Sequence, residues 1–486
     1  MKEDQYFNAR RDEVKQHFNS LAGEYGYWKR KNSYYFKLLK DLFREIVPNG
    51  KSVLEMGCGT GDVLVCLEPI YGVGVDVSEG MVNAAKTKHP KMDFFVGAAE
   101  SIKLDEQFDY VVMADLIDHL VDVQGTLKNV RPMIKWGGRL VISTINPLWS
   151  PILLISEKLG LKMPEGYHNF VLKDDICNIL RLEDYEVVDS GYRILIPKYF
   201  PLLSDFINKF APRIKFIREF CLCQYIVATP SSAPRGESPD ISLSIVIPCY
   251  NEEDNIMACV ARIPRITLSQ EVVLVNDGST DGTERAIMGL RSDNPRYIKV
   301  VSYHNNQGKG HAVKKGFEAA NGEVLMILDA DMSLMPEELP RFYEAIKNKK
   351  GDFINGTRMM YPMEDESMRL LNLIGNNIFS RALSLLVGQR LTDTLCGTKC
   401  LFKSDFKKMM MGRDRWGDFD LLFGAAKLKL RIVEVPVHYQ RRDWGESKML
   451  PLKHGFQLFM VCLVFLFELK LRLQWDRIKR RGVEDT

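Results

Sequence analysis

Two carboxylates separated by one residue end an apolar run in the second half of the chain. Asp329 and Asp331 close the sequence VLMILDAD, which begins at Val324. Carboxylate oxygens suit a hard divalent cation, and such a cation neutralises the charge of a diphosphate leaving group. An Asp-x-Asp pair can also be a surface or capping feature. Here it ends a strand-like run that follows two other acid-ended runs, which favours a cation site.

Those two earlier runs also end in polar turns. The first runs from Ile245 into a turn with Pro248, Tyr250 and Glu252, and the second ends at Asp277 before GSTDGT. Parallel strands that end in such turns form a rim able to hold a ribose and a base. We expect Glu252 and Asp277 to make these contacts.

A glycine-rich turn dominates the first half of the chain. The sequence VLEMGCGTGD places Gly57, Gly59 and Gly61 at alternate positions after an apolar run, and Asp76 ends the next run. Glycines let the backbone pass close to a ligand, and an acid at the following strand end can accept bonds from ribose hydroxyls. The pattern predicts a nucleoside-containing cofactor, and a dinucleotide fold also fits it. His119 is a candidate base, because an imidazole titrates near neutral pH; it could equally be a histidine hydrogen-bonded beside the pocket.

Short β-branched runs alternate with amphipathic segments in both halves, which is typical of parallel βαβ architecture. The expected strands are Ser52–Glu55, Gly72–Asp76, Asp93–Val96, Phe108–Val112, Gly138–Ser143 and Cys223–Ala228, and then Leu243–Ile247, Glu271–Asn276, Ile298–Tyr303, Val324–Asp329 and Asp352–Thr357. The sequence ATPSSAPRGESPD predicts a linker over residues 229–240. We therefore expect an α/β protein with domains at residues 1–228 and 241–452, followed by a C-terminal segment at 453–486.

Composition narrows the functional classes. The 486 residues carry a net charge of only +3, and no known nucleic-acid module is present, so nucleic acid is not an expected partner. Ten cysteines in a chain of this length do not form a disulfide scaffold. The charged N-terminus shows no signal peptide. These features predict a cytoplasmic protein.

The first half resembles the class I S-adenosylmethionine-dependent methyltransferases over about residues 10–230. VLEMGCGTGD resembles their first motif, GVDVSEGMVNAAK the second, FFVGAAE the third and FDYVV with DHL the fourth. The resemblance implies a Rossmann-like domain that binds S-adenosylmethionine. Glu55 and the three glycines would then surround the methionine part, Asp76 would hold the ribose, and Met81 would pack on the adenine. Ala98 stands where the family usually has an acidic residue.

The second half resembles the family 2 glycosyltransferases of the GT-A fold, and within them the polyprenyl-phosphate sugar synthases. The motifs are IPCYNEEDNI, VNDGSTDGT, GKGHAVKKGFEAANGEVLMILDADMS, TDTLCGTKCLF and RRDWGESKM, in family order over residues 243–449. By this resemblance Asp329 contacts the ribose or sugar and shares Mg²⁺ or Mn²⁺ with Asp331, while Lys309 lies near the phosphates. The donor would be a UDP- or GDP-linked sugar.

The resemblance also implies an acceptor side. Asp418 and Asp420 resemble the acidic pair that faces the acceptor, and Arg442, Ser447 and Lys448 resemble a phosphate-binding element. We expect an inverting in-line displacement. A polyprenyl phosphate is already an anion and hardly requires a strong base.

The C-terminal segment predicts membrane contact. Residues 456–467 are uncharged and apolar, too short a run to span a bilayer, and basic residues follow them. We expect an apolar helix at the interface and a protein peripheral on the cytoplasmic face of a membrane. Two alternatives stay open. The methyltransferase-like half could be a non-catalytic binding module, given Ala98 and no unambiguous base, and the acceptor could be a soluble or cell-wall glycan.

Overall fold

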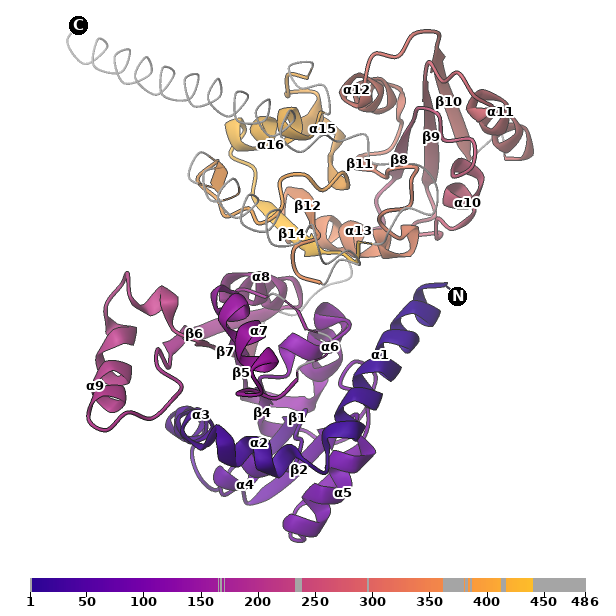
Figure 1. The fold of residues 1–486 in the computed structure, drawn as a ribbon. Helices are drawn as coiled ribbons and strands as arrows, with labels where there is room; N and C mark the ends of the chain where they lie inside the picture. The colour runs from indigo at the N-terminus through magenta and orange to yellow at the C-terminus, as the bar shows by residue number, and fades with distance from the viewer. Residues whose placement is uncertain are drawn as a thin grey trace, which may run out of the picture. The chain divides into compact units, whose positions relative to one another are not determined.

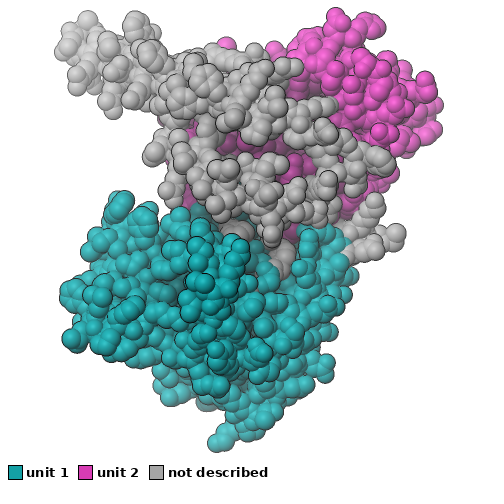
Figure 2. Space-filling view, in the orientation of Figure 1, with its two compact units in different colours: residues 1–235, 359–362 teal, residues 236–358, 363–486 magenta. Residues whose placement is uncertain are grey.

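The computed structural model describes residues 2–164, 166, 168–169, 171–231, 238–294, 297–361, 380, 383–384, 387–411 and 417–439 (Figure 1). The chain divides into two compact units (Figure 2). Unit 1 comprises residues 1–235 and 359–362, and unit 2 comprises residues 236–358 and 363–486.

Unit 1 alternates strands and helices after three N-terminal helices. Its strands are β1 Ser52–Met56, β2 Tyr71–Asp76, β3 Asp93–Val96, β4 Phe108–Ala114, β5 Ile134–Ile145, β6 Tyr185–Arg193 and β7 Cys223–Pro230. Its α-helices are α1 Lys2–Leu21, α2 Tyr25–Lys31, α3 Ser33–Ile46, α4 Asp62–Cys66, α5 Glu79–Lys88, α6 Val123–Val130, α7 Ser150–Lys158, α8 Lys173–Leu182 and α9 Leu203–Phe210. Short 3₁₀ turns are η1 Ile117–His119, η2 Arg131–Met133, η3 Pro147–Trp149, η4 Ala211–Arg213 and η5 Arg218–Phe220.

The described strands of unit 1 form a seven-stranded sheet in the order β3-β2-β1-β4-β5-β7-β6. β3, β2, β1, β4 and β5 run parallel, and β7 is antiparallel to both β5 and β6. The chain moves outward from β1 to β3 and then returns to β4 on the other side of β1. This reversal leaves a crevice at the carboxyl ends of β1 and β4, the place where open α/β sheets bind ligands.

Two cores cover the two faces of this sheet. Successive side chains of a strand point to opposite faces. Leu54 of β1 therefore packs with α6 and α8, while its neighbour Val53 packs with α3, α4 and α5. The amphipathic helices each bury one stripe against the sheet, whose central strand β1 is buried throughout.

Unit 2 repeats this alternation. Its strands are β8 Leu243–Cys249, β9 Gln270–Asp277, β10 Ile298–Tyr303, β11 Val324–Ile327, β12 Phe353–Thr357, β13 Lys399–Phe402 and β14 Ile432–Pro436. Its helices are α10 Ile256–Ala261, α11 Thr283–Asp293, α12 Lys309–Ala319, α13 Leu339–Lys347, α15 Lys403–Phe406 and α16 Asp418–Lys427, with a 3₁₀ turn η6 at Pro336–Glu338.

The described strands of unit 2 also form a seven-stranded sheet, in the order β10-β9-β8-β11-β13-β12-β14. β13 is antiparallel to β11 and to β12, and the remaining neighbours run parallel. From β8 the chain moves outward through β9 to β10 and then returns to β11 on the other side of β8. Val246, Val273 and Val275 of the sheet pack there with Val313 and Phe317 of α12 and with residues of α16.

Every expected strand is confirmed within a few residues. The expectation of parallel architecture is wrong for β7 and β13, because both sheets are mixed. β6, β13 and β14 were not expected. The predicted C-terminal apolar helix lies outside the described residues, and no described helix has the length and apolar character needed to cross a bilayer.

Candidate functional sites

The glycine turn after β1 has the conformation that its sequence predicts. Gly57, Gly59 and Gly61 have φ values of +71°, +50° and +75°, which side chains rarely adopt. A Cβ on Gly57 would lie 2.6 Å from Leu116 Cδ1, and a Cβ on Gly61 would lie 2.8 Å from Phe94 Cζ. The turn therefore requires glycine for its backbone and for its space, and leaves a cradle beside β1.

Asp76 joins this turn to the next one. The backbone N–H of Gly59 donates to Asp76 Oδ2 (2.8 Å) and that of Ser78 donates to Oδ1 (2.9 Å). Burial raises the pKa of Asp76. Ser78 caps α5 by accepting from the backbone N–H of Met81, whose side chain is buried. A buried carboxylate at this strand end suits the two hydroxyls of a ribose.

Glu55 is a second buried acid in the same crevice. Its Oε2 accepts the backbone N–H of Leu64 at 2.8 Å. Burial raises the pKa of Glu55 to about 8. The carboxyl of the empty protein therefore holds its proton near neutral pH, and a cationic group such as an amino-acid ammonium would favour its release.

The N-terminal helices cover the crevice and add residues that the sequence did not single out. Lys29 Nζ lies 2.7 Å from Asp62 Oδ2 and 3.1 Å from Thr60 Oγ1, and 4.6 Å from the ring centroid of Tyr25. The Tyr25 hydroxyl would lie 3.5 Å from a Cβ on Gly59. Burial, and then the charge of Asp76, raise the pKa of Tyr25. Helix α2 thus places an aromatic ring over the glycine turn.

Asp115 was also missed. It follows β4 directly and has φ +55°, a strained conformation for a residue other than glycine. The Tyr35 hydroxyl donates to its Oδ2 (2.7 Å), and the Ser143 hydroxyl donates to its Oδ1 (2.6 Å). Burial and the charge of Asp115 raise the pKa of Tyr35. The acid lies at the carboxyl end of β4, beside the crevice between β1 and β4, and its position directly after a strand was the available signal.

His119 lies in an aromatic cluster at the end of η1. Its ring packs edge-on against Phe18 of α1 at 5.0 Å between centroids and lies 5.8 Å from the ring of His168. The neighbouring Asp118 is buried and accepts from the Thr144 hydroxyl and the Ile145 backbone. Asp118 is therefore a structural residue, whereas the ring of His119 lies between Phe18 and His168.

In unit 2, Asp277 fixes the loop before α12. Its Oδ1 accepts the backbone N–H of Gln307 (2.8 Å). Its Oδ2 accepts the backbone N–H of Gly308 (2.9 Å) and an N–H of the Asn306 side-chain amide (3.1 Å). The expected ribose contact is thus also the anchor of the Gly308–Lys309 turn. In the turn after the neighbouring strand β8, Glu252 follows Pro248 and Tyr250 and accepts from the Asn255 side chain at 2.8 Å.

Lys309 lies against Asp329. Its Nζ is 2.6 Å from Asp329 Oδ1 and 2.9 Å from Oδ2. A Cβ on Gly397 would lie 2.1 Å from Asp329 Oδ2 and 2.8 Å from Lys309 Nζ, so only glycine fits beside this pair. The pair is partly exposed at the carboxyl end of β11. The structure thus brings together Lys309 and Asp329, which lie at the two ends of one sequence motif, and Gly397 from another.

Asp331 and the start of α16 also lie near the carboxyl end of β11. Asp331 Oδ1 accepts the backbone N–H of Ser333 at 3.0 Å, and Met332 between them has φ +54°. A Cβ on Gly417 would lie 2.8 Å from Gly310 Cα, so α16 begins in contact with the start of α12. Asp420 is buried near that end.

A buried ion pair supports the loop that carries Gly397. Arg358 Nε and Nη2 lie 2.6 Å and 2.9 Å from the two oxygens of Asp393. Burial alone would raise the pKa of Asp393, but the Arg358 guanidinium holds that pKa below its ordinary value. Glu434 of β14 accepts the backbone N–H groups of Thr392 and Asp393. The Arg358–Asp393 ion pair was not expected, although Asp393 lies in the motif TDTLCGTKCLF.

Several expected residues lie outside the described part of the chain. These are Arg442, Ser447, Lys448 and the side chain of Asp418. Among the described residues, no group of three or more His, Cys, Asp or Glu side chains gathers as a metal site would require.

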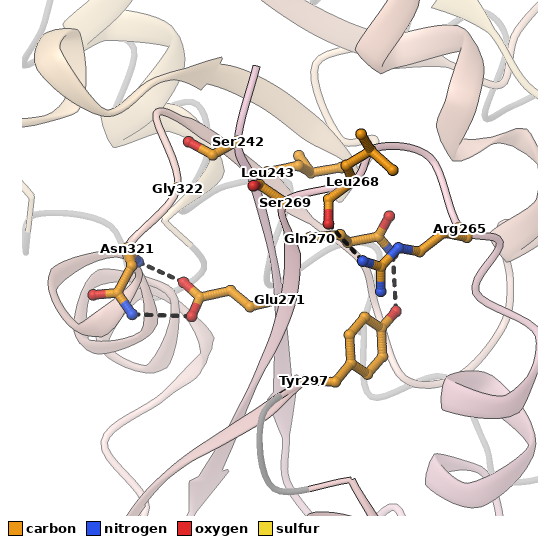
Figure 3. A pocket seen from close by; sticks show the side chains of 10 residues that line it. All are labelled: Ser242, Leu243, Arg265, Leu268, Ser269, Gln270, Glu271, Tyr297, Asn321 and Gly322. Carbon is orange, nitrogen blue, oxygen red and sulfur yellow. Dashed lines mark hydrogen bonds between the residues drawn. The ribbon is translucent and has the colours of Figure 1, made fainter. Parts of the chain in front are cut away.

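A pocket of about 390 Å³ lies at the opposite ends of these strands (Figure 3). Its polar side chains already bond one another: Gln270 donates to Tyr297 and to Pro264 O, and Glu271 accepts from Asn321. It is lined by the first residues of β8 and β9, away from the acid-ended turns, and is not the candidate site.

Both units match family models of transferases. Residues 244–410 match the model for Glycosyl transferase family 2, and residues 27–190 match a model for a methyltransferase domain. The two expected resemblances are confirmed: the chain carries a family 2 glycosyltransferase domain and a methyltransferase domain.

Similar proteins are known for each unit. An undecaprenyl-phosphate 4-deoxy-4-formamido-L-arabinose transferase of Yersinia pestis is 27% identical over 214 residues, which are 43% of this chain and 63% of the relative. The transferase of the same name from Aeromonas hydrophila is 29% identical, over 48% of this chain and 71% of the relative. A SAM-dependent methyltransferase of Thermotoga maritima has 18% identity and a TM-score of 0.36, over 44% of this chain and 99% of its own.

Proposed function

We propose that unit 2 transfers a sugar from a UDP- or GDP-linked donor to a polyprenyl phosphate, with inversion at the anomeric carbon. The observation that carries this proposal is the contact of Lys309 and Asp329 beside Gly397, with Asp331 two residues away. The names of the similar transferases support a polyprenyl-phosphate acceptor.

Asp329 and Asp331 would hold Mg²⁺ or Mn²⁺. Two carboxylates with substrate phosphates are a common environment for Mg²⁺, which keeps few protein ligands. The bound cation would supply charge neutralisation at the departing diphosphate. Lys309 pairs with Asp329 and would also bind the phosphates of the donor. Because Gly397 has no side chain, it leaves space beside the Asp329 carboxylate and the Lys309 ammonium.

The acceptor would approach from the α16 side. Asp418 and Asp420 would orient it, and Arg442, Ser447 and Lys448 would bind its phosphate through charge-assisted hydrogen bonds. The phosphate oxygen attacks as an anion, so these acids need not remove a proton. We also propose peripheral association with the cytoplasmic face of a membrane, where such an acceptor is presented.

For unit 1 we propose methyl transfer from S-adenosylmethionine to an acceptor that is not yet identified. Gly57, Gly59 and Gly61 form the cradle, Asp76 would bind the ribose and Glu55 the ammonium of the methionine part. Met81 would support the adenine, and His119 would take a proton from the acceptor. The bound cofactor supplies the electrophilic methyl group, and the protein residues hold and orient it.

Mass spectrometry of the products tests both proposals. Purified protein would receive UDP- and GDP-sugars, a polyprenyl phosphate, a soluble glycan and S-adenosylmethionine. We expect a polyprenyl-phosphate sugar as one product and a methylated compound as another. Sugar transfer only to a soluble glycan would replace the first proposal. S-adenosylmethionine binding without turnover on any acceptor tested would favour a binding module over the second.

A further inference from the structure

The connection between β6 and β7 in unit 1 carries exposed apolar side chains. It holds α9, η4 and η5, and α9 projects to one side of the sheet in Figure 1. Leu202 is 88% exposed, Phe206 63% and Phe216 76%. Phe200, Leu203, Phe210, Ile214 and Phe220 are exposed as well. Scattered apolar residues are normal on a surface, but a gathering of this kind marks an interaction site.

Helix α9 is amphipathic with its polar side turned inward. Ser204 is completely buried: its hydroxyl accepts from the Phe200 backbone and donates to Lys198 O, both at 2.8 Å. The Asn208 side chain accepts the backbone N–H groups of Leu195 and Ile196 and donates to Ile196 O. A helix packed on its own core shows the reverse arrangement.

Contacts to α3 hold this orientation. The Tyr34 hydroxyl donates to Asp205 Oδ1 at 2.7 Å, and the Asn208 amide donates to the Tyr34 hydroxyl at 3.3 Å. Leu202, which precedes α9, has φ +62°. The apolar side chains therefore point outward because the polar ones are bound to the protein.

The exposed rings lie in contact with one another and with cations. Phe206 and Phe210 lie 4.8 Å apart between centroids, and Phe216 and Phe220 lie 5.5 Å apart. The Arg213 guanidinium lies 5.8 Å from the Phe210 ring. Residues 198–220, which carry both ring pairs, are defined here as the docking face.

The docking face is positively charged. It contains Lys198, Lys209, Arg213, Lys215 and Arg218, against the acids Asp205 and Glu219. Asp205 is bound to Tyr34, and all five cations are exposed. Long basic side chains that flank apolar ones suit a bilayer interface, where the rings enter the headgroup region and the cations meet anionic phosphates.

We propose that unit 1 docks on an anionic lipid bilayer through this face. A second copy of the chain is a poorer occupant, because a two-fold contact would bring the same cations of both copies together. The proposal does not rest on the sugar-transfer proposal, and it concerns a surface distinct from the C-terminal segment. Tyr34, which bonds α9, is followed in the sequence by Tyr35, which bonds Asp115 after β4.

Vesicle partitioning of the full chain tests the proposal. The test variant is Leu202→Asp/Phe206→Asp. The matched control is Ile70→Asp/Leu268→Asp, because Ile70 and Leu268 are 81% and 85% exposed outside the docking face. Vesicles of phosphatidylcholine with phosphatidylglycerol are compared with phosphatidylcholine alone at subsaturating lipid. Hydrogen exchange of peptides from residues 198–220 reports where the bilayer touches the protein.

We expect the test variant to lose at least about tenfold in partitioning to anionic vesicles, while the control partitions like the wild type. Anionic vesicles should slow exchange over residues 198–220 in the wild type. Equal partitioning of test and control variants would overturn the proposal, as would unchanged exchange over these residues. A wild-type dimer that the test variant converts to a monomer would assign the face to a second copy instead.

Discussion

Binding of S-adenosylhomocysteine should release a proton from Glu55. Burial raises the pKa of this carboxyl to about 8, so it is mostly protonated at pH 7 before the ligand binds. The ligand ammonium would return that pKa toward its ordinary value, so nearly one proton should leave for each ligand bound at pH 7. Affinity should therefore rise by close to tenfold from pH 6 to pH 7 and level off above pH 8.

Calorimetry in buffers of different ionisation enthalpy measures this proton release directly. Glu55→Gln should abolish it, whereas Glu106→Gln, which alters a surface acid bonded to Tyr71, should leave it unchanged. In this experiment the slope of the binding enthalpy against the buffer ionisation enthalpy gives the number of protons released. A slope of zero for the wild type, or a slope that persists in Glu55→Gln, would refute the assignment of this proton to Glu55. The same shift affects folding. Because the folded pKa is raised, the free energy of unfolding falls as pH rises from about 4.5 to about 8, and Glu55→Gln should flatten that fall.

Three further substitutions test other parts of the sites. Asp76→Ala should weaken binding of S-adenosylhomocysteine by about 1–3 kcal/mol in calorimetry, through loss of the ribose contacts; unchanged affinity would place the ribose elsewhere. Gly397→Ala should stop sugar transfer and leave cofactor binding by unit 1 intact, because its Cβ would overlap the Asp329 carboxylate; an active variant would show that the pair moves freely. Asp393→Asn should destabilise unit 2 by about 3–5 kcal/mol in denaturant unfolding, since Arg358 loses its buried partner; a neutral result would mean that water replaces it.

The sequence predicts those features that depend on local order. Strand positions follow from β-branched runs, and the acids Asp76, Asp277 and Asp329 are visible because each ends such a run. The glycine-rich turn at Gly57, Gly59 and Gly61 is visible because the spacing of its glycines after an apolar run is itself a local pattern.

Features that depend on sheet order were not predictable in this way. Gly397 meets Lys309 and Asp329 because the chain returns beside β11 as the antiparallel strand β13, which has no strong local signal. Tyr35 meets Asp115 across 80 residues. The pattern of α9 shows an amphipathic helix, but a pattern does not tell which side faces the protein. Its inward polar side follows from bonds to Tyr34.

The central claim is that Asp329 and Asp331 hold a divalent cation during sugar transfer to a polyprenyl phosphate. The most direct measurement is the rate of polyprenyl-phosphate sugar formation by the full chain with EDTA, and after addition of Mg²⁺ or Mn²⁺. We predict that EDTA stops the reaction, that either cation restores it, and that folded Asp331→Asn is nearly inactive with both. An undiminished rate in EDTA, or normal turnover by Asp331→Asn, would contradict the account.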